Sequence, residues 1–375
     1  MATVEKEAWV EAAWQRTIAK IGRNATEIGA RFPHASFDGV YNSCPAHDWG
    51  AGFWPGMLWL AYRETGGELL KKTAVELETR LGETLVAYDE LHHDVGFMFS
   101  LSSVAQYKLL GDPAARRHGL MAANLLAGRF NVNGGFIRAW PDWDGEDHSG
   151  WAIIDCIMNL PLLYWASEEL GDPRYKHIAM RHADMALREF LRPDGSAYHI
   201  VCFDPETGAR SGALAGQGFA ADSAWARGTA WALYGFALSY RYTAQERYLD
   251  AAKRAAHYFL SRLPADKAPY WDFLLQDSTG MPRDTSAAAI AASGMLEIAL
   301  YADPADARFF RSAAADVVRS LDENYGAWEQ KEQGLLLHAT GYFAKDSNVD
   351  VPIIYGDYFF AEALMKLRGG NDLFW

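Results

Sequence analysis

The chain has 375 residues, of which 50% are hydrophobic and 14% are aromatic, so it carries ample apolar surface for a folded core and is not disordered. A chain of this length suits either two domains or one closed array of repeated units. It contains 35 Lys and Arg against 48 Asp and Glu, and the net charge of −13 disfavours nucleic acid as a partner, because binding a polyanion needs clustered cations.

The N-terminal segment lacks the basic start and the apolar stretch of a secretory signal. The most apolar helix candidate, residues 286–302, is rich in small residues and contains Glu297, which is typical of a protein interior and not of a membrane span. The three cysteines, Cys44, Cys156 and Cys202, form no CxxC pair, so neither a disulfide framework nor a thiolate zinc site is indicated. We therefore expect a cytoplasmic protein.

Two types of predicted helix alternate along the chain. Helices of the first type are amphipathic: in the one that begins near residue 244, Tyr248, Ala251, Ala255 and Phe259 form a single apolar stripe. Six such helices are predicted, with starts near residues 6, 67, 112, 172, 244 and 304. Helices of the second type are apolar nearly all round, as buried helices must be. Six of these are predicted, over residues 52–64, 95–110, 151–170, 224–242, 286–302 and 355–367.

The junctions that lead into the amphipathic helices are short. In the LGDP sequences at Leu110 and Leu170, Gly closes one helix in the left-handed conformation, Asp caps the next helix, and Pro takes its first position. Six such hairpins bury all the apolar helices if they close into a ring. We therefore predict an all-α fold, one (α/α)6 barrel domain over residues 1–375, with six inner and six outer helices. The alternative, an open helical solenoid, needs polar terminal repeats, and residues 355–367 are too apolar for that role.

The loops that enter the inner helices are long and converge on one mouth of the predicted ring. They combine Trp and Tyr with carboxylate and amide side chains, and long loops on a rigid scaffold are where binding and catalysis usually lie. This composition indicates a sugar ligand, because aromatic faces stack on pyranose rings while carboxylates and amides bond their hydroxyls. Trp49, Trp140, Trp225 and Trp231 all lie at or near the starts of inner helices. The alternative is that these aromatic residues only pack the inner wall.

Two acids are the main catalytic candidates. Asp155 lies in the first two turns of a nearly apolar inner helix, where desolvation raises the pKa of a carboxyl and suits it to act as a general acid. The alternative is a buried Asp that only bonds a neighbouring helix. Asp94 stands where a helix N-cap would stand, and capping alone is a competing explanation for it.

Metal and nucleotide chemistry have little support in the sequence. His92 and His93 beside Asp94, and His47 beside Asp48, match no usual ligand spacing, so no metal is expected. The chain has no G-x-G-x-x-G after a predicted strand and no G-x-S-x-G, so neither a nucleotide cofactor nor the common serine nucleophile is predicted.

Seven segments carry a resemblance to a known family. They are DWGAGFWPGMLWL from Asp48, LHHDVGFMFSLS from Leu91, IIDCIMNLPLLYWA from Ile153, YHIVCFDPETG from Tyr198, SAWARGTAWALYGFALSYRY from Ser223, YWDFLLQDSTGMPRDTSAAAI from Tyr270 and YGDYFFAEALMKL from Tyr355. Over nearly its whole length the chain resembles the unsaturated glucuronyl hydrolases of glycoside hydrolase family 88, which have the (α/α)6 barrel. The stretch from His338 to Asp350 departs from the family pattern, on the aglycone side.

The resemblance implies a glycoside hydrolase that needs no cofactor. Its substrate would be an unsaturated (4,5-ene) uronic acid at the non-reducing end of a lyase-generated oligosaccharide, most simply a disaccharide. The matching catalytic residue is Asp155, which would protonate C4 and then, as the carboxylate, activate the water that adds at C5. Asp94 would bind ring hydroxyls and help to keep Asp155 protonated. The implied substrate-binding residues are Trp49, His93, Trp140, His199, Gln217, Trp225, Arg227, Trp231 and Tyr342.

Three other functions stay open on the sequence. The first is an unsaturated rhamnogalacturonyl hydrolase, with the same barrel and chemistry but a pectin-derived substrate. The second is an N-acylhexosamine epimerase, in which His93 and His199 would shuttle protons and Asp155 would have no task. The third is a toroid that binds oligosaccharide without catalysis. For Arg227, pairing with the uronate carboxylate and bracing of helix starts are both open.

Overall fold

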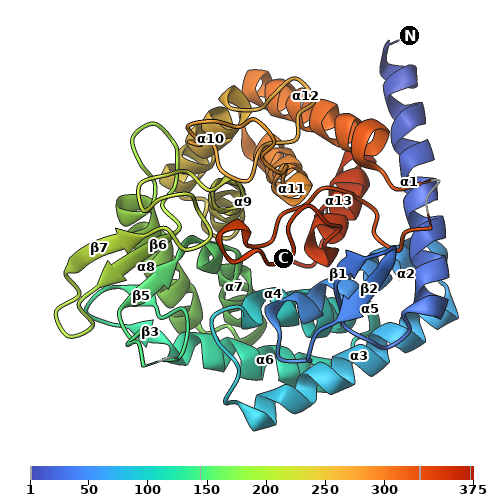
Figure 1. The fold of residues 1–375 in the computed structure, drawn as a ribbon. Helices are drawn as coiled ribbons and strands as arrows, with labels where there is room; N and C mark the ends of the chain where they lie inside the picture. Colours follow the sequence, from blue (N-terminus) through green and yellow to red (C-terminus); the bar gives the residue numbers. More distant parts are fainter. Residues whose placement is uncertain (1, 144, 329–330, 372) are drawn as a thin grey trace.

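The computed structural model describes residues 2–143, 145–328, 331–371 and 373–375, which form the ring of helical hairpins that the sequence predicts (Figure 1). The outer helices are α1 (Ala2–Glu27), α3 (Glu68–Ala87), α6 (Pro113–Gly128), α8 (Pro173–Glu189), α10 (Glu246–Ser261) and α12 (Pro304–Ser320). The inner wall consists of α2 (Phe53–Thr65), α4 (Val95–Phe99) with α5 (Ala105–Leu110), α7 (Leu160–Leu170), α9 (Ala226–Thr243), α11 (Thr285–Tyr301) and α13 (Ile354–Leu367). The predicted (α/α)6 barrel is therefore confirmed.

Three outer helices begin with the cap that the Asp-Pro sequences predict. The carboxylates of Asp112, Asp172 and Asp303 accept the backbone N–H two residues on, at 2.8, 3.0 and 2.9 Å. Gly111 and Gly171 precede two of these caps with φ angles of 68° and 63°, so the inner helix ends in the left-handed conformation that glycine adopts without strain. The sequence thus determines the hairpin junctions locally.

The inner helices are buried almost entirely. In α11, every residue from Thr285 to Ile298 is buried, because the helix packs against α9, α12 and α13. The C-terminal Trp375 lies within the ring (Figure 1), where its indole stacks on Phe359 at 5.9 Å and meets the edge of Phe97 at 5.9 Å. None of the described helices is both long enough and apolar enough to cross a membrane.

Short strands occur in the long loops, where the sequence pattern predicts none. Two hairpins pair β1 (Pro33–Phe37) with β2 (Val40–Ser43), and β3 (Phe130–Asn131) with β4 (Phe136–Ile137). A three-stranded antiparallel sheet joins β5 (Trp151–Ile153), β6 (Ile200–Phe203) and β7 (Arg210–Leu214). The β1–β2 hairpin is local, because Asp38 and Gly39 form its two-residue turn with φ angles of 52° and 84°. The partner of β5, in contrast, lies far along the chain, so tertiary contacts form that pairing.

The β5–β6 pairing has a direct consequence for function. Ile153 pairs with Ile200, and the backbone N–H of Ile154 donates to the carbonyl of His199 at 3.0 Å. The sheet therefore sets His199 beside Asp155, although 44 positions separate them in the sequence.

Candidate active site

Asp155 lies in a 3₁₀ turn, Ile154–Met158, that follows β5 and precedes α7. The sequence analysis places it within the α-helix itself, but α7 begins only at Leu160 because Pro161 takes the first turn of the helix. The Asp155 side chain is 16% exposed, and its Oδ2 atom has no hydrogen-bond partner among the described residues. Burial, reinforced by the negative charge of Asp94 and only partly offset by His93 and Arg227, raises the pKa of Asp155 to about 7.

Asp94 is the N-terminal flanking residue of α4, but its side chain makes no capping hydrogen bond in the described structure. Instead, its carboxylate accepts the Asn159 side-chain amide at 2.9 Å and lies 3.3 Å from His93 Nε2 and 3.5 Å from His92 Nδ1. Burial alone would raise its pKa, yet the histidines and the Asn159 hydrogen bond outweigh that cost and lower the pKa of Asp94 to about 2. The two carboxyls therefore differ in protonation at neutral pH.

Asn159 is a site residue that the sequence analysis missed. Besides its bond to Asp94, its side-chain oxygen accepts the backbone N–H of Phe97 at 2.7 Å, so it ties α4 to the turn that carries Asp155. Gly96 permits this approach, since a Cβ atom there would overlap the Asn159 backbone. The signal in the sequence was a lone amide four residues after Asp155 in an otherwise apolar helix.

His199 lies beside Asp155, with 3.7 Å between its Nε2 atom and the Asp155 Oδ2 atom. Burial lowers the pKa of His199 to about 3, so its imidazole is neutral at physiological pH. Its ring centroid is 4.4 Å from that of Trp225, which is 2% exposed. His199, Trp225 and Asp155 thus form one buried group at the mouth of the ring.

Arg227 is buried and holds together three loops at the mouth of the ring. It donates to Asp284 Oδ2 at 2.6 Å, to Gln217 Oε1 at 2.6 Å, and to the backbone carbonyls of Thr340 and Gly341 at 2.5 and 2.7 Å. The guanidinium therefore braces these loops in the structure, which is the second of the two roles that the sequence left open. Asp284, the N-cap of α11, was not among the predicted site residues.

The predicted aromatic residues fall into two groups. Trp49 and Trp140 are half-buried; Trp49 packs on Tyr355 at 4.9 Å and Trp140 meets His93 edge-on at 6.4 Å. Trp231 is different, because it is fully buried and packs between Phe97 at 5.0 Å and Phe359 at 5.4 Å. In this structure Trp231 supports the site from within the core and offers no surface to a ligand.

Tyr342 lies in the loop before α13, half-buried, with the Lys345 ammonium 5.1 Å from the centre of its ring. It follows Gly341, whose carbonyl accepts from Arg227, so it joins the site through that arginine. Tyr355, which the sequence analysis did not name as a site residue, lies 5.1 Å from Arg227 and contacts Trp49. Tyr355 lies in α13, which is apolar nearly all round, so the sequence pattern does not distinguish it from a core residue.

Among the residues that the structure describes, two groups of three side chains have the donor atoms that a metal ion would need. In each group these atoms lie within 4.8 Å of one another; the groups are His34, Cys44 and Asp48, and His92, His93 and Asp94. In the first, burial and the nearby Asp48 raise the pKa of the Cys44 thiol, which opposes the thiolate that a metal requires. In the second, one Asp94 oxygen is bonded by Asn159, and His92 Nδ1 accepts the Asp94 backbone N–H at 3.4 Å. Both groups therefore fit hydrogen bonding better than metal binding.

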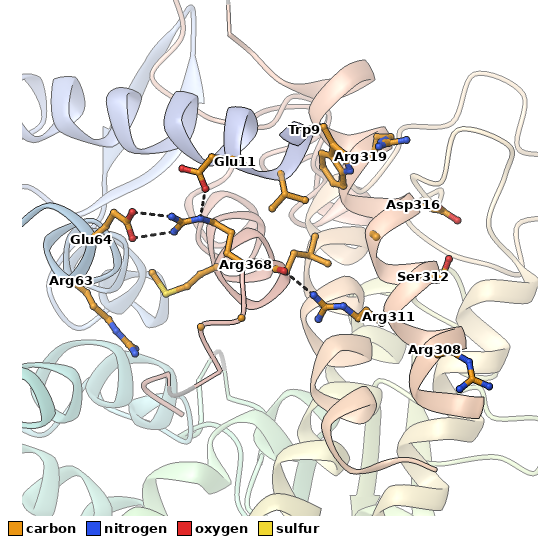
Figure 2. A pocket seen from close by; sticks show the side chains of 16 residues that line it. Trp9, Glu11, Arg63, Glu64, Arg308, Arg311, Ser312, Asp316, Arg319 and Arg368 are labelled. Carbon is orange, nitrogen blue, oxygen red and sulfur yellow. Dashed lines mark hydrogen bonds and ion pairs between the residues drawn. The ribbon is translucent and has the colours of Figure 1, made fainter. Parts of the chain in front are cut away.

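A cavity of about 1110 Å³ lies at the opposite end of the ring from these residues, between α1, α12 and the ends of α2 and α13 (Figure 2). Two of its three carboxylates share one partner: Arg368 bonds Glu11 at 2.7 Å and Glu64 at 3.0 Å. Hydrogen bonds from Gln15 and Arg368 lower the pKa of Glu11, and the bond from Arg368 lowers the pKa of Glu64. Acids that stay ionised are unsuited to proton donation at neutral pH. The loop end, with Asp155 and Asp94, is therefore the candidate active site.

Comparison with known proteins identifies the family of the chain. A family model described as Glycosyl Hydrolase Family 88 matches residues 24–324. An unsaturated glucuronyl hydrolase of Bacillus sp. (strain GL1) is 40% identical over 372 residues, covering 96% of this chain and 98% of that protein. A crystal structure of the Bacillus sp. GL1 enzyme has a TM-score of 0.93 at 38% identity, over 98% of this chain and 99% of that one. A mutant of the Streptococcus agalactiae enzyme complexed with dGlcA-GalNAc6S has a TM-score of 0.85 at 33% identity, over 98% and 93%.

Proposed function

This chain belongs to glycosyl hydrolase family 88, and from that premise we propose that it hydrolyses oligosaccharides carrying an unsaturated (4,5-ene) uronic acid at the non-reducing end. One observation carries the proposal: a carboxyl with a pKa of about 7, Asp155, lies beside a carboxylate with a pKa of about 2, Asp94. A single acid that both gives and takes a proton near neutral pH suits hydration of a vinyl ether.

The reaction begins with proton transfer from the neutral Asp155 carboxyl to C4 of the unsaturated ring. Positive charge then develops at C5 and is shared with the ring oxygen. A water molecule adds at C5 and passes its proton to the Asp155 carboxylate, which restores the acid. The resulting hemiketal opens to a ketone at C5, and the hemiacetal left at C1 releases the aglycone sugar. No second carboxylate has to attack C1, so the separation rule for ordinary glycosidases does not apply.

Asp94 supports this chemistry in two ways. Its carboxylate accepts hydrogen bonds from ring hydroxyls, and its charge disfavours ionisation of Asp155. The Asn159 amide keeps Asp94 in place with a 2.9 Å hydrogen bond. Since Asp94 stays ionised from about pH 2 upward, it performs both tasks over the whole physiological range.

The remaining predicted residues divide between binding and support. Trp49 and Trp140 are half-buried and available to stack on sugar rings, as is the half-buried Tyr342, whereas His93 is buried and lies 3.3 Å from the Asp94 carboxylate. Gln217 is half-buried, and its side-chain oxygen accepts a hydrogen bond from Arg227, which leaves its amide nitrogen to bond a sugar hydroxyl. Trp225 packs beside His199 as part of the inner wall.

Among the alternatives, an epimerase has the weakest physical support. It needs histidines that gain and lose protons near neutral pH, whereas the pKa of His199 is lowered to about 3 by burial. A rhamnogalacturonyl hydrolase shares the chemistry and differs in its aglycone loops. The relatives of known name act on unsaturated glucuronyl substrates, which favours that class for this chain.

We further propose that residues 1–375 act as one catalytic domain in the cytoplasm. The first and last elements support one domain, because α1 packs against α13 and Trp375 reaches Phe97 of α4. All three cysteines are free thiols, as a reducing compartment would keep them.

The test is a comparison of two matched substrates. Unsaturated disaccharides generated by a polysaccharide lyase should lose the ultraviolet absorbance of the conjugated double bond, and the saturated glucuronides with the same aglycone should remain intact. Cleavage of the saturated substrates alone would contradict the hydration mechanism. A panel that varies the aglycone and its sulfation then separates glycosaminoglycan-derived from pectin-derived substrates.

A further inference from the structure

The two ring nitrogens of His199 have different surroundings, and this difference assigns its proton. The backbone N–H of Gln217 points at Nδ1, with 2.8 Å between the two nitrogens. A backbone amide nitrogen only donates, so Nδ1 must accept and the proton of the neutral ring must be on Nε2. The Ala215 carbonyl lies 3.2 Å from the same Nδ1 atom. A proton on Nδ1 that pointed to this carbonyl would face the Gln217 N–H at 2.8 Å, which disfavours that tautomer.

Gly216 makes this arrangement possible. Its φ angle of +55° turns the chain so that the next amide lies over the imidazole ring. A Cβ atom at this position would overlap the His199 Nδ1 and Cε1 atoms and would lie 2.8 Å from Ile200 Cδ1. Any other residue would therefore have to displace the ring or the turn, and would also carry the strain of a left-handed backbone.

On the other side of the ring, Nε2 faces Asp155. Nε2 and the Asp155 Oδ2 atom are 3.7 Å apart, which is beyond hydrogen-bond distance, and both atoms are buried without a hydrogen-bond partner in the described residues. To become a cation, His199 would have to add its second proton at Nδ1, where the Gln217 N–H already points. Arg227 and His93 oppose that positive charge as well.

The charge of His199 matters because of what surrounds Asp155. The groups that act on Asp155 are the Asp94 carboxylate, which favours the protonated acid, and His93 and Arg227, which favour the carboxylate. The phenol of Tyr355 is also close enough to interact with Asp155. An imidazolium at 3.7 Å would add a strong stabilisation of the carboxylate, of roughly one to three pKa units for an opposite charge at this distance.

We propose that Gly216 and the backbone amide of Gln217 clamp His199 in the neutral tautomer with its proton on Nε2, and that this clamp lets Asp155 keep the proton it donates. Gly216 and Gln217 are thus positioning residues for the reaction. The effect of this clamp on catalysis rests on the proposed function. The tautomer of His199, however, is a property of the protein without substrate and can be measured in its absence.

The first experiment is nuclear magnetic resonance of the full chain labelled with ¹⁵N in its histidines, with the His199 signals assigned by loss in His199→Gln. Between pH 5.5 and 8, Nε2 of His199 should resonate as a protonated ring nitrogen and Nδ1 as an unprotonated one. A proton on Nδ1, or conversion to imidazolium within this range, would overturn the proposal. If the proposed function is wrong, the protein will not turn over the unsaturated disaccharide, but the NMR spectrum will still show the proton of His199 on Nε2.

The second experiment uses Gly216→Ala, with Gly280→Ala as the matched control. Gly280 also has a positive φ, of 71°, but no atom lies within 4 Å of its would-be side chain, so it reports backbone strain alone. In Gly216→Ala, His199 becomes able to protonate, and kcat at pH 6 should be roughly ten-fold below that of the unmodified enzyme at the same pH, whereas the control keeps the pH profile of the unmodified enzyme.

The double variant Gly216→Ala with His199→Gln decides whether the effect passes through His199. Gln cannot become a cation, so the double variant should lose the added fall in kcat towards pH 6 even if its overall rate is lower. If the fall persists, Gly216 does not act through His199 and the proposal is wrong. If Gly216→Ala does not fold, the NMR measurement on the unmodified protein still decides the tautomer.

Discussion

The two ends of the barrel both carry acids beside aromatic and basic side chains, but the acids at the two ends differ in burial and in ion pairing. At the far end, Glu11 and Glu64 are 49% and 31% exposed and share Arg368 as an ion-pair partner (Figure 2). At the loop end, Asp155 is 16% exposed, and the nearby Arg227 is engaged by Asp284 at 2.6 Å. The raised pKa of Asp155 therefore comes from desolvation that no ion pair offsets, and not from the number of charges nearby.

The largest effect that separates the two ends should come from Asp155→Asn. Asn preserves shape and hydrogen-bonding capacity but has no proton to exchange, so kcat should fall by roughly 10³-fold while KM changes little. The loss of ultraviolet absorbance of an unsaturated disaccharide measures both constants. Glu64→Gln, the matched change at the far end, should leave kcat as it is. Comparable activity of the Asp155 variant would remove the basis of the proposed mechanism.

The pH profile tests the difference in protonation within the loop end. Because Asp155 must be protonated to donate, kcat/KM of the unmodified enzyme should decrease as pH rises through about 7. Asp94→Asn removes the negative charge that favours the protonated acid, so this decrease should begin at lower pH, by about one unit, and the rate should fall. Asp147→Asn, which removes an exposed charge from a mouth loop, serves as the control. An unshifted profile in Asp94→Asn would show that burial alone sets the pKa.

The burial of Asp155 should also make the stability of the protein depend on pH. The pKa of Asp155 is raised from 3.8 to about 7 in the folded protein, so between these values the folded state binds a proton that the unfolded state has released. Stability from this group is therefore lost as pH rises from about 4 to about 7, by up to about 4 kcal/mol. Asp155→Asn should then increase the free energy of unfolding at pH 8 and have little effect near pH 4. Chemical denaturation at the two pH values measures this, and equal effects at both would contradict it.

The smallest effect is expected at the far end. Glu11→Gln removes one exposed partner of Arg368, and exposed ion pairs contribute only about 0.2–1 kcal/mol to stability. The free energy of unfolding should fall by less than about 1 kcal/mol, and kcat should not change. A loss of several kcal/mol, or any loss of turnover, would mean that the two ends are coupled and that the contrast drawn between them is too simple.

The aromatic residues show where sequence and structure disagree. Trp49 and Trp140 lie at the mouth as predicted, but Trp231 is fully buried, because its position on α9 directs it to the inside of the ring. A Trp in an apolar helix gives the same sequence pattern whether its side chain contacts a ligand or packs against other core side chains. The same is true of Asp94, which stands at a cap position but bonds Asn159 instead of the helix start.

What the sequence by itself determined is the set of elements whose causes are local. Helix faces follow from the spacing of apolar residues, and the Asp-Pro and Gly signals mark the hairpin junctions, so the order of outer and inner helices and the closed ring could be predicted. Asp155 could be singled out because it is an acid in an apolar segment and lies near the start of an inner helix, where the long loops converge.

Only the tertiary structure decided which groups meet at the mouth of the ring. The β5–β6 pairing sets His199 beside Asp155, Gly96 lets Asn159 reach Asp94, and Arg227 is bonded to loops more than 50 positions away. The physical reason is that these contacts join segments remote in the chain. The protonation of a carboxyl depends on the solvent and charges that such contacts bring to it or exclude from it.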